Sequence, residues 1–224
     1  MMGAVTLYHM PGSCSHVALA ALEAIGSPYE DRTVALMAGA QRDPAYLAIN
    51  AKGKVPVLID SALTLTELPV ILFHLARRHP EAALLPTDAD GTSPSLAGLS
   101  DLTWLAGVLQ PLANRIFRPG GVAPGHPDEA KAEAIRQLAG HAAFVSDRIG
   151  SGWWHGDRWS IVDEFLTWIF GVAATVGFPL ADYPGLAAHG DRTRALPPHR
   201  GARARERDAV ARDGLTLPPG FTLD

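Results

Sequence analysis

The chain has 224 residues, 47% of them hydrophobic, and a formal net charge of −4 at pH 7. This length provides a sizeable core, in one large domain or two small ones, and the hydrophobic content argues against disorder. The acidic balance argues against nucleic acid as a partner, because phosphates require a basic surface. The single cysteine, Cys14, excludes an internal disulfide and a cysteine-rich metal site, and it favours a reducing cytoplasm.

No secretory or membrane segment is expected. The N-terminus lacks the basic region and the apolar region of a secretory signal. The longest uncharged run, residues 165–181, is too short and too often interrupted by Gly, Thr and Pro to span a bilayer. We expect it to form a buried core helix.

The first third of the chain predicts an α/β unit. Segments rich in β-branched, aromatic and other apolar residues predict strands at 4–9, 29–36, 55–59 and 63–66. After Cys14, apolar side chains from Val17 onward cover one face of a helix that ends at Gly26. A helical turn at 43–50 and a second helix at 69–79 complete the unit.

Residues 86–94 form a polar linker, and the residue pattern of almost the whole chain after it predicts helices. One helix begins with acidic residues in its first turn and ends at Gly150. Residues 160–163 form a capping-box start for the next helix, with Asp in place of the usual Glu or Gln. The Arg-rich stretch 192–212 also contains acidic residues, so we expect a solvated helical face rather than a binding patch.

Cys14 is the first candidate for chemistry. It follows a Pro-Gly turn at a helix start, where unpaired amides and the helix dipole favour a thiolate, its own or a substrate's. A small buried hydrophobe is the alternative. The flanking Ser13 and Ser15 suit helix capping, or a hydrogen bond to a substrate thiolate. Tyr8, at the end of a strand, could donate the same bond, although strand packing is its more usual role.

Two further markers lie downstream. Pro56 begins a strand, and the bond before it can be cis, which would leave the backbone of Val55 free to pair with a peptide. An ordinary strand start is the alternative. Glu67 lies in the first turn of a helix. Its carboxylate either interacts with the helix dipole or holds an ammonium group, while nearby amides hold a carboxylate.

Four histidines, His9, His16, His74 and His79, form no HExxH or other metal-ligand pattern. We therefore expect surface or capping roles for them and no metal cofactor.

These segments, in this order, resemble those of the cytosolic glutathione S-transferase superfamily, with bacterial beta-class members the most similar. Tyr8–Ser15 resembles the opening segment of that class, in which the equivalent cysteine contacts glutathione. Lys52–Leu58 resembles the cis-proline segment. Leu65–Glu67 resembles the segment with the glutamate that binds the γ-glutamyl group.

The resemblance covers nearly the whole chain. Gly156–Asp163 resembles the capping box in the core helix of the second domain, and Trp104–Leu105 with Ile116–Pro119 resembles its first helix. The implied fold is an α/β thioredoxin-like N-terminal domain followed by an all-α C-terminal helical domain. The implied glutathione-binding domain, linker and second-substrate domain are residues 1–82, 83–94 and 95–224.

The resemblance implies an enzyme that activates the thiol of glutathione, its co-substrate, for attack on a small hydrophobic electrophile or for a mixed disulfide. It also implies a cytoplasmic homodimer with a role in detoxification and no metal. The implied catalytic residues are Cys14, Ser13 and Tyr8. The implied glutathione contacts are Val55, Pro56, Glu67 and Leu68. The second-substrate wall would include Gln110, Trp104 and Phe117, for which core packing or surface polarity is at least as common a role.

Three positions depart from the family pattern. Leu68 replaces the usual serine, and loss of that hydroxyl costs about 1.5–3 kcal/mol, or roughly ten- to a hundred-fold in affinity. A lysine for the glycyl carboxylate falls near Gly39, and a second-domain histidine falls at Gln110, which cannot titrate. Two alternatives therefore stay open. One is a glutathione-dependent isomerase of the zeta class, which Ser13–Ser15 also resembles; the other is a non-catalytic binding protein that has lost glutathione.

Overall fold

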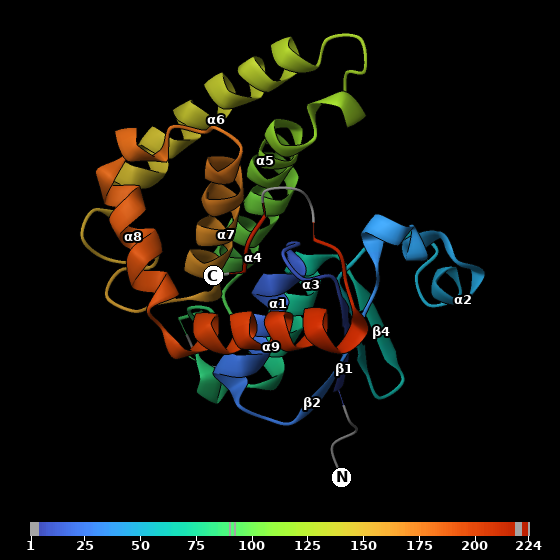
Figure 1. The fold of residues 1–224 in the computed structure, drawn as a ribbon. Helices are drawn as coiled ribbons and strands as arrows, with labels where there is room; N and C mark the ends of the chain where they lie inside the picture. The colour runs from blue at the N-terminus through green and yellow to red at the C-terminus, as the bar shows by residue number, and fades with distance from the viewer. Residues whose placement is uncertain (1–4, 90, 92, 218–220, 224) are drawn as a thin grey trace.

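Four strands in the order β2-β1-β3-β4 form a mixed sheet in the N-terminal third of the chain. They are β1 (Val5–His9), β2 (Tyr29–Thr33), β3 (Val57–Asp60) and β4 (Leu63–Thr66). Strand β1 runs parallel to β2 and antiparallel to β3, which pairs with β4 as a hairpin. The structure is a computed structural model that describes residues 5–89, 91, 93–217 and 221–223 (Figure 1).

All four predicted strands are present, but two are shorter than predicted. Strand β2 ends at Thr33, and a 3-10 turn, Leu36–Ala38, follows. Strand β3 begins at Val57 because Pro56 has no N–H to donate to a neighbouring strand. The Val55–Pro56 bond is cis.

The predicted helices of this unit are confirmed as α1 (Ser15–Ile25), α2 (Pro44–Leu47) and α3 (Leu68–Arg78). Helix α1 ends at Gly26, whose φ of 73° glycine adopts without strain. The single apolar face predicted for α1 is wrong, because Ser15–Leu22 is buried all round. Helix α3 covers it within the α/β unit, and α7 and α9 of the second domain cover its other side.

From residue 96 onward the described chain is mainly helical. Its helices are α4 (Leu96–Trp104), α5 (Gln110–Phe117), α6 (Pro127–Ile149), α7 (Ile161–Thr175), α8 (Pro184–Arg194) and α9 (Pro197–Asp213). Helix α7 is almost wholly buried, which confirms the predicted core helix, although it begins earlier and ends at Thr175. No described helix is both long enough and apolar enough to cross a membrane.

The capping box at the start of α7 is confirmed. The backbone N–H and the hydroxyl of Ser160 each lie 2.8 Å from Oδ2 of Asp163. The other carboxylate oxygen accepts from the N–H of Trp154 at 2.7 Å and lies 2.9 Å from Nε2 of His189. Asp163 is fully buried, so it joins three segments of the second domain at one point.

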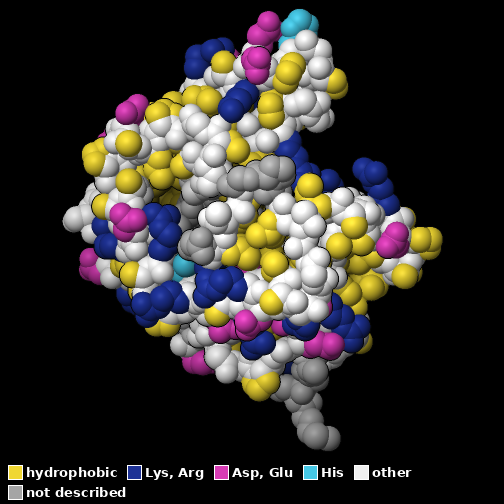
Figure 2. All heavy atoms as spheres, viewed as in Figure 1, with side chains coloured by type: hydrophobic (Ala, Val, Ile, Leu, Met, Phe, Trp, Pro, Cys, Tyr) yellow, Lys and Arg dark blue, Asp and Glu magenta, His cyan; other side chains and the backbone are white. Residues whose placement is uncertain are grey.

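The predicted solvated face at 192–212 is confirmed for α9, on which Arg200, Arg207 and Arg212 are exposed, but the same helix also has a buried face that crosses α1 closely (Figure 1). The buried residues of α9 recur every three or four positions: His199, Ala202, Glu206 and Ala209. Arginines beside this buried stripe pair with the α/β unit, Arg205 with Glu23 at 3.2 Å and Arg212 with Asp31 at 3.0 Å. Figure 2 accordingly shows basic and acidic side chains intermixed over this part of the surface.

Candidate functional site

A cleft of about 440 Å³ opens between the α/β unit and helices α5 and α7. The α/β unit contributes the turn 10–14 after β1, parts of segment 36–41, and residues 53–55 before β3. Hydrophobic side chains gather in a hollow near the centre of the view in Figure 2. The cleft therefore lies where the two halves of the chain meet.

The turn at Gly12 is held by the second domain. The Gly12 N–H donates to Oε1 of Glu206 at 2.8 Å, and its carbonyl accepts from Nε1 of Trp168 at 3.2 Å. Gly12 has a φ of 80°, and a Cβ atom there would lie 2.5 Å from the ring of Phe221. Only glycine fits this turn without strain, so α7, α9 and the C-terminal segment together set its position.

Cys14 lies at the N-cap position of α1 and is buried. Burial raises the pKa of its thiol to about 11, although hydrogen bonds from the Gln110 side chain and from the backbone act in the opposite direction. The predicted thiolate-forming effect of the helix start is therefore wrong for the thiol of Cys14 itself. Desolvation of a charged sulfur outweighs the partial charge of the helix end, and the thiol is neutral at pH 7.

Ser13 lines the cleft, and its hydroxyl also supports the turn. Its hydroxyl donates to the Met10 carbonyl at 2.7 Å and accepts from the Ser15 N–H at 3.2 Å. Tyr8 lies outside the described lining of the cleft, where its hydroxyl accepts from Nη1 of Arg32 at 3.3 Å. Alternation along β1 directs Tyr8 to the opposite face of the sheet from Leu7. Among the described residues, neither hydroxyl forms a hydrogen bond with the sulfur of Cys14.

Gln110 approaches the thiol from the second domain: it lines the same cleft as Cys14, and its side chain acts to lower the pKa of the Cys14 thiol. A π-helical turn, Leu105–Leu109, precedes it, and Pro111 follows. Proline has no N–H for the regular helical ladder, and π-helical turns change the direction in which later side chains point. Phe117, two helical turns further on, lines the same cleft.

Trp104 lies away from the cleft. Its ring stacks on Trp154 at a centroid distance of 5.8 Å and meets Phe144 edge-on at 6.0 Å. These contacts give it a packing role in the second domain. Of the three residues predicted for the second-substrate wall, the structure brings Gln110 and Phe117 to the cleft.

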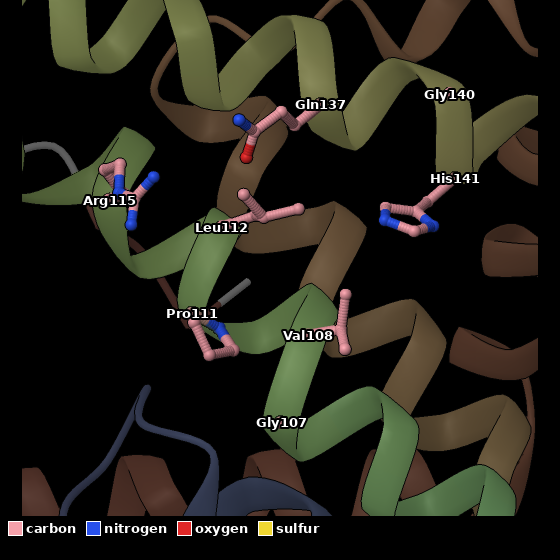
Figure 3. A pocket seen from close by; sticks show the side chains of 8 residues that line it. All are labelled: Gly107, Val108, Pro111, Leu112, Arg115, Gln137, Gly140 and His141. Atoms are coloured by element: carbon pink, nitrogen blue, oxygen red, sulfur yellow. The ribbon is translucent and has the colours of Figure 1, made fainter.

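A second pocket of about 600 Å³ lies between α5 and α6. Figure 3 shows Arg115 and Leu112 of α5 facing Gln137 and His141 of α6. Its described lining contains none of the site residues predicted from the sequence. This pocket is separate from the cleft at Cys14.

Val55 lines the cleft just before β3 begins. The preceding carbonyl, that of Lys54, accepts from the Tyr46 hydroxyl at 2.6 Å and from Nδ2 of Asn50 at 2.8 Å. These bonds hold the segment before β3, and Val55 precedes the first residue paired in the sheet. Its backbone is thus placed beside the cleft rather than within the strand ladder.

Glu67 and Leu68 form the start of α3. Glu67 has a φ of 76°, a conformation that costs a residue with a side chain about 1–3 kcal/mol. Its exposed carboxylate lies 2.6 Å from Nζ of Lys52. The Leu68 side chain is buried, whereas its N–H belongs to the first helical turn, where amides have no partner within the helix.

Several residues of the cleft were not predicted as site residues from the sequence, among them Lys54, Arg118 and Trp168. Arg118 follows α5, and its guanidinium carbon lies 5.7 Å from the ring centre of Phe117. Arg118 follows Gln110 by about two helical turns, so the sequence pattern could have placed both side chains on the same side of the helix. No sequence pattern distinguished Trp168, because it belongs to an apolar helix whose residues all have the composition of a buried core.

Three of the four histidines are buried: His9, His16 and His79. The predicted surface or capping role is therefore wrong for His9 and His16, whereas His79 occupies the C-cap position of α3. His16 lies 3.0 Å from both Glu164 and Glu206. Burial alone would lower the pKa of His16, but these carboxylates raise it. The partners are 148 and 190 residues away in sequence, beyond any local pattern.

Comparison with known proteins adds to this geometry. Residues 3–77 match the family model described as glutathione S-transferase, N-terminal domain. The chain is 32% identical over 191 residues to maleylacetoacetate isomerase of Pseudomonas aeruginosa, covering 81% of this chain and 87% of that protein. It is similar to the beta-class glutathione S-transferase of Sphingomonas chungbukensis, with a TM-score of 0.75, 30% identity, and coverage of 90% and 98%. A sphingomonad glutathione S-transferase complexed with glutathione gives a TM-score of 0.75 and 30% identity, over 94% of this chain and all of that one.

Proposed function

Because the chain belongs to the glutathione S-transferase family, we propose that its cleft binds glutathione and directs the glutathione thiol at a small electrophilic carbon. The observation that carries this proposal is that Cys14, Val55 and Gln110 line one cleft between the two domains. A solved relative of 30% identity is complexed with glutathione, which supports the same ligand here.

The γ-glutamyl end of glutathione would lie at the start of α3, with its ammonium group on Glu67. The Lys52–Glu67 ion pair is exposed on both sides, so it contributes at most about 1 kcal/mol and a ligand ammonium can replace it. The Leu68 N–H would hold the adjacent carboxylate. Val55 would pair with the peptide backbone of glutathione in strand fashion, beside the Pro56 ring.

Positive charge in the cleft supports binding of the glycyl carboxylate. Gly39 has no side chain to offer it, but Lys54 and Arg118 both line the cleft. Either cation can hold a carboxylate there. They offset part of the affinity that the missing hydroxyl at Leu68 costs.

Activation of the glutathione thiol would fall to hydrogen-bond donors beside Cys14. The Gln110 amide, the Cys14 S–H and the amides at the start of α1 would donate to the glutathione sulfur and stabilise its thiolate. The thiol proton leaves to water, the sulfur forms a bond to the electrophilic carbon, and the leaving group departs with the bonding electrons. A pKa of about 11 argues against Cys14 as the nucleophile of a mixed-disulfide route.

Isomerisation is the second candidate, favoured by the 32% identity to maleylacetoacetate isomerase. Glutathione thiolate would add to a carbon–carbon double bond, rotation would follow about the resulting single bond, and elimination would release glutathione unchanged. The two cations of the cleft, Lys54 and Arg118, suit a substrate that carries carboxylates.

Calorimetric titration of the purified protein with reduced glutathione tests the shared premise. We expect binding in the micromolar-to-millimolar range, weakened in Glu67→Gln and unchanged in Gln137→Ala, which alters the separate pocket between α5 and α6. Absence of heat and of any thermal shift at high glutathione would favour the non-catalytic alternative. Glutathione consumption then separates the two reactions, since a transferase consumes one equivalent per turnover and an isomerase consumes none.

We also propose a cytoplasmic homodimer, with domain limits as predicted at 1–82 and 95–224. Large exposed apolar side chains support an interface: Leu63 is 44%, Val70 46% and Leu96 70% exposed. Sedimentation should give about twice the chain mass of 23.8 kDa, and Val70→Glu should shift the protein toward monomer. A wild-type monomer at micromolar concentration would contradict this proposal.

A further inference from the structure

Three buried donor atoms from three different helices meet between the two domains. They are Nε2 of His16 on α1, Oε1 of Glu164 on α7 and Nδ1 of His199 on α9. The histidine nitrogens lie 3.0 and 2.7 Å from the carboxylate oxygen and 3.3 Å from each other. All three side chains lie outside the described lining of the glutathione cleft, so this cluster is a separate feature.

The triangle of donor atoms has the dimensions of a metal site. Zinc binds histidine nitrogen and carboxylate oxygen at about 2.0–2.2 Å, which places neighbouring tetrahedral donors about 3.3–3.5 Å apart. The two separations from the Glu164 oxygen need to widen by roughly 0.3–0.8 Å to reach that spacing, whereas the two histidine nitrogens are already at it. Two imidazoles and one carboxylate also form a donor set that suits divalent transition metals.

A second carboxylate orients the first histidine. Nδ1 of His16, the ring nitrogen opposite the triangle, lies 3.0 Å from Oε2 of Glu206. Arg203 donates to that same oxygen at 2.9 Å, which holds the carboxylate in place. Metal-binding histidines usually donate their other ring N–H to a carboxylate in this way. The surroundings of His16 thus match those of a metal ligand.

One oxygen of the cluster is unexplained by hydrogen bonding. Oε2 of Glu164 has no hydrogen-bond partner among the described residues, although the side chain is fully buried. Buried polar atoms nearly always have partners, so this carboxylate oxygen is available to bind a cation. With both oxygens bound, Glu164 and the two histidines would supply four donor atoms.

We propose that His16, Glu164 and His199 form a structural site for one divalent transition-metal ion, for which Zn²⁺ is the best match. The ion joins α1 of the N-terminal domain to α7 and α9 of the helical domain. Its binding stabilises their association, and through Glu206 it also supports the turn at Gly12. None of the three ligands lines the cleft, so this inference does not rest on the proposed function.

The test uses untagged, full-length protein freed of metal with a chelator and titrated with Zn²⁺. We expect one equivalent bound and a higher thermal midpoint with zinc. His199→Gln should weaken zinc binding at least tenfold. His126→Gln is the matched control, because it removes an exposed histidine paired with a glutamate, Glu129, one turn away. Cys14→Ser should bind zinc as the wild type does, which excludes the thiol as a ligand.

Cobalt gives a readout that does not depend on whether a variant folds. Co²⁺ bound to the wild-type protein should show the strong visible absorption of a four-coordinate ion, without the near-ultraviolet band of a thiolate ligand. No bound zinc in the wild type, a weak six-coordinate cobalt spectrum, unchanged zinc affinity in His199→Gln, or loss of zinc in Cys14→Ser would each overturn the proposal.

Discussion

Alkylation of Cys14 should be slow at neutral pH and should rise with pH without levelling off below about pH 10. Burial raises the pKa of the thiol to about 11, and the thiolate is the reactive form. Against an ordinary cysteine of pKa about 8.5, the thiolate fraction at pH 7 is lower by roughly 300-fold. The greater nucleophilicity of a more basic thiolate recovers about tenfold. We therefore expect a rate about 30-fold below that of a free cysteine, before any steric effect.

Gln110→Leu should slow the reaction further. The substitution removes the Gln110 amide, which acts to lower the pKa of the Cys14 thiol, and keeps a side chain of similar size, so the thiol stays buried. A hydrogen bond to a charged group contributes about 1.5–3 kcal/mol, equivalent to about one to two units in the thiol pKa. At fixed pH the thiolate population should fall about ten- to a hundred-fold.

Mass spectrometry of the Cys14 peptide after iodoacetamide treatment, from pH 6.5 to 9.5, measures this rate. Gln137→Leu serves as the control, because it replaces a glutamine in the pocket between α5 and α6. A plateau with a midpoint near pH 7 would refute the reasoning, since it would show that the helix start outweighs burial. An unchanged rate in Gln110→Leu would show that its amide does not act on the sulfur.

Three further outcomes are expected. Gly12→Ala should lower the free energy of unfolding by about 1–3 kcal/mol in urea, because φ is 80° and the new Cβ meets the Phe221 ring; an unchanged midpoint would contradict this. Asp163→Ala should cost about 3–5 kcal/mol, because several buried donors lose one acceptor; a loss below 1 kcal/mol would contradict the assigned network. A hydrogen bond from His9 is the main factor lowering the pKa of Asp31 to about 2, below its ordinary 3.8. The stabilisation is present above about pH 4 and is lost as pH falls toward 2, so the thermal midpoint of Asp31→Asn should vary less over that range.

Much of the fold was predictable because it depends on interactions between residues close in sequence. Gly26 ends α1 through its own backbone freedom, and Pro56 delays the start of β3 because it lacks an N–H. The capping box at the start of α7 joins Ser160 to Asp163, three positions further along the chain. Each of these effects acts within one helical turn or one strand end, so the pattern of residues carries it directly.

The candidate site was predictable in outline but not in its side-chain geometry. Cys14 and Val55 were predicted from their local settings, and the structure places both at the cleft. Gln110 and Trp104 were both predicted to line the second-substrate wall, yet of these two residues only Gln110 lines the cleft. Six positions along a helix correspond to about one and two-thirds turns, so the two side chains point in different directions, and only the packing of the helices decides which of them faces the cleft.

The sequence by itself determined the family, the strands and helices of both domains, and the approximate place of the site near Cys14. The tertiary structure alone decided the protonation state of Cys14, because burial by distant helices outweighs the local effect of the helix start. It also decided the role of His16, whose partners Glu164, His199 and Glu206 come from helices at the far end of the chain. Secondary structure and capping depend on near neighbours, whereas desolvation and buried charge pairing depend on whatever the fold packs alongside.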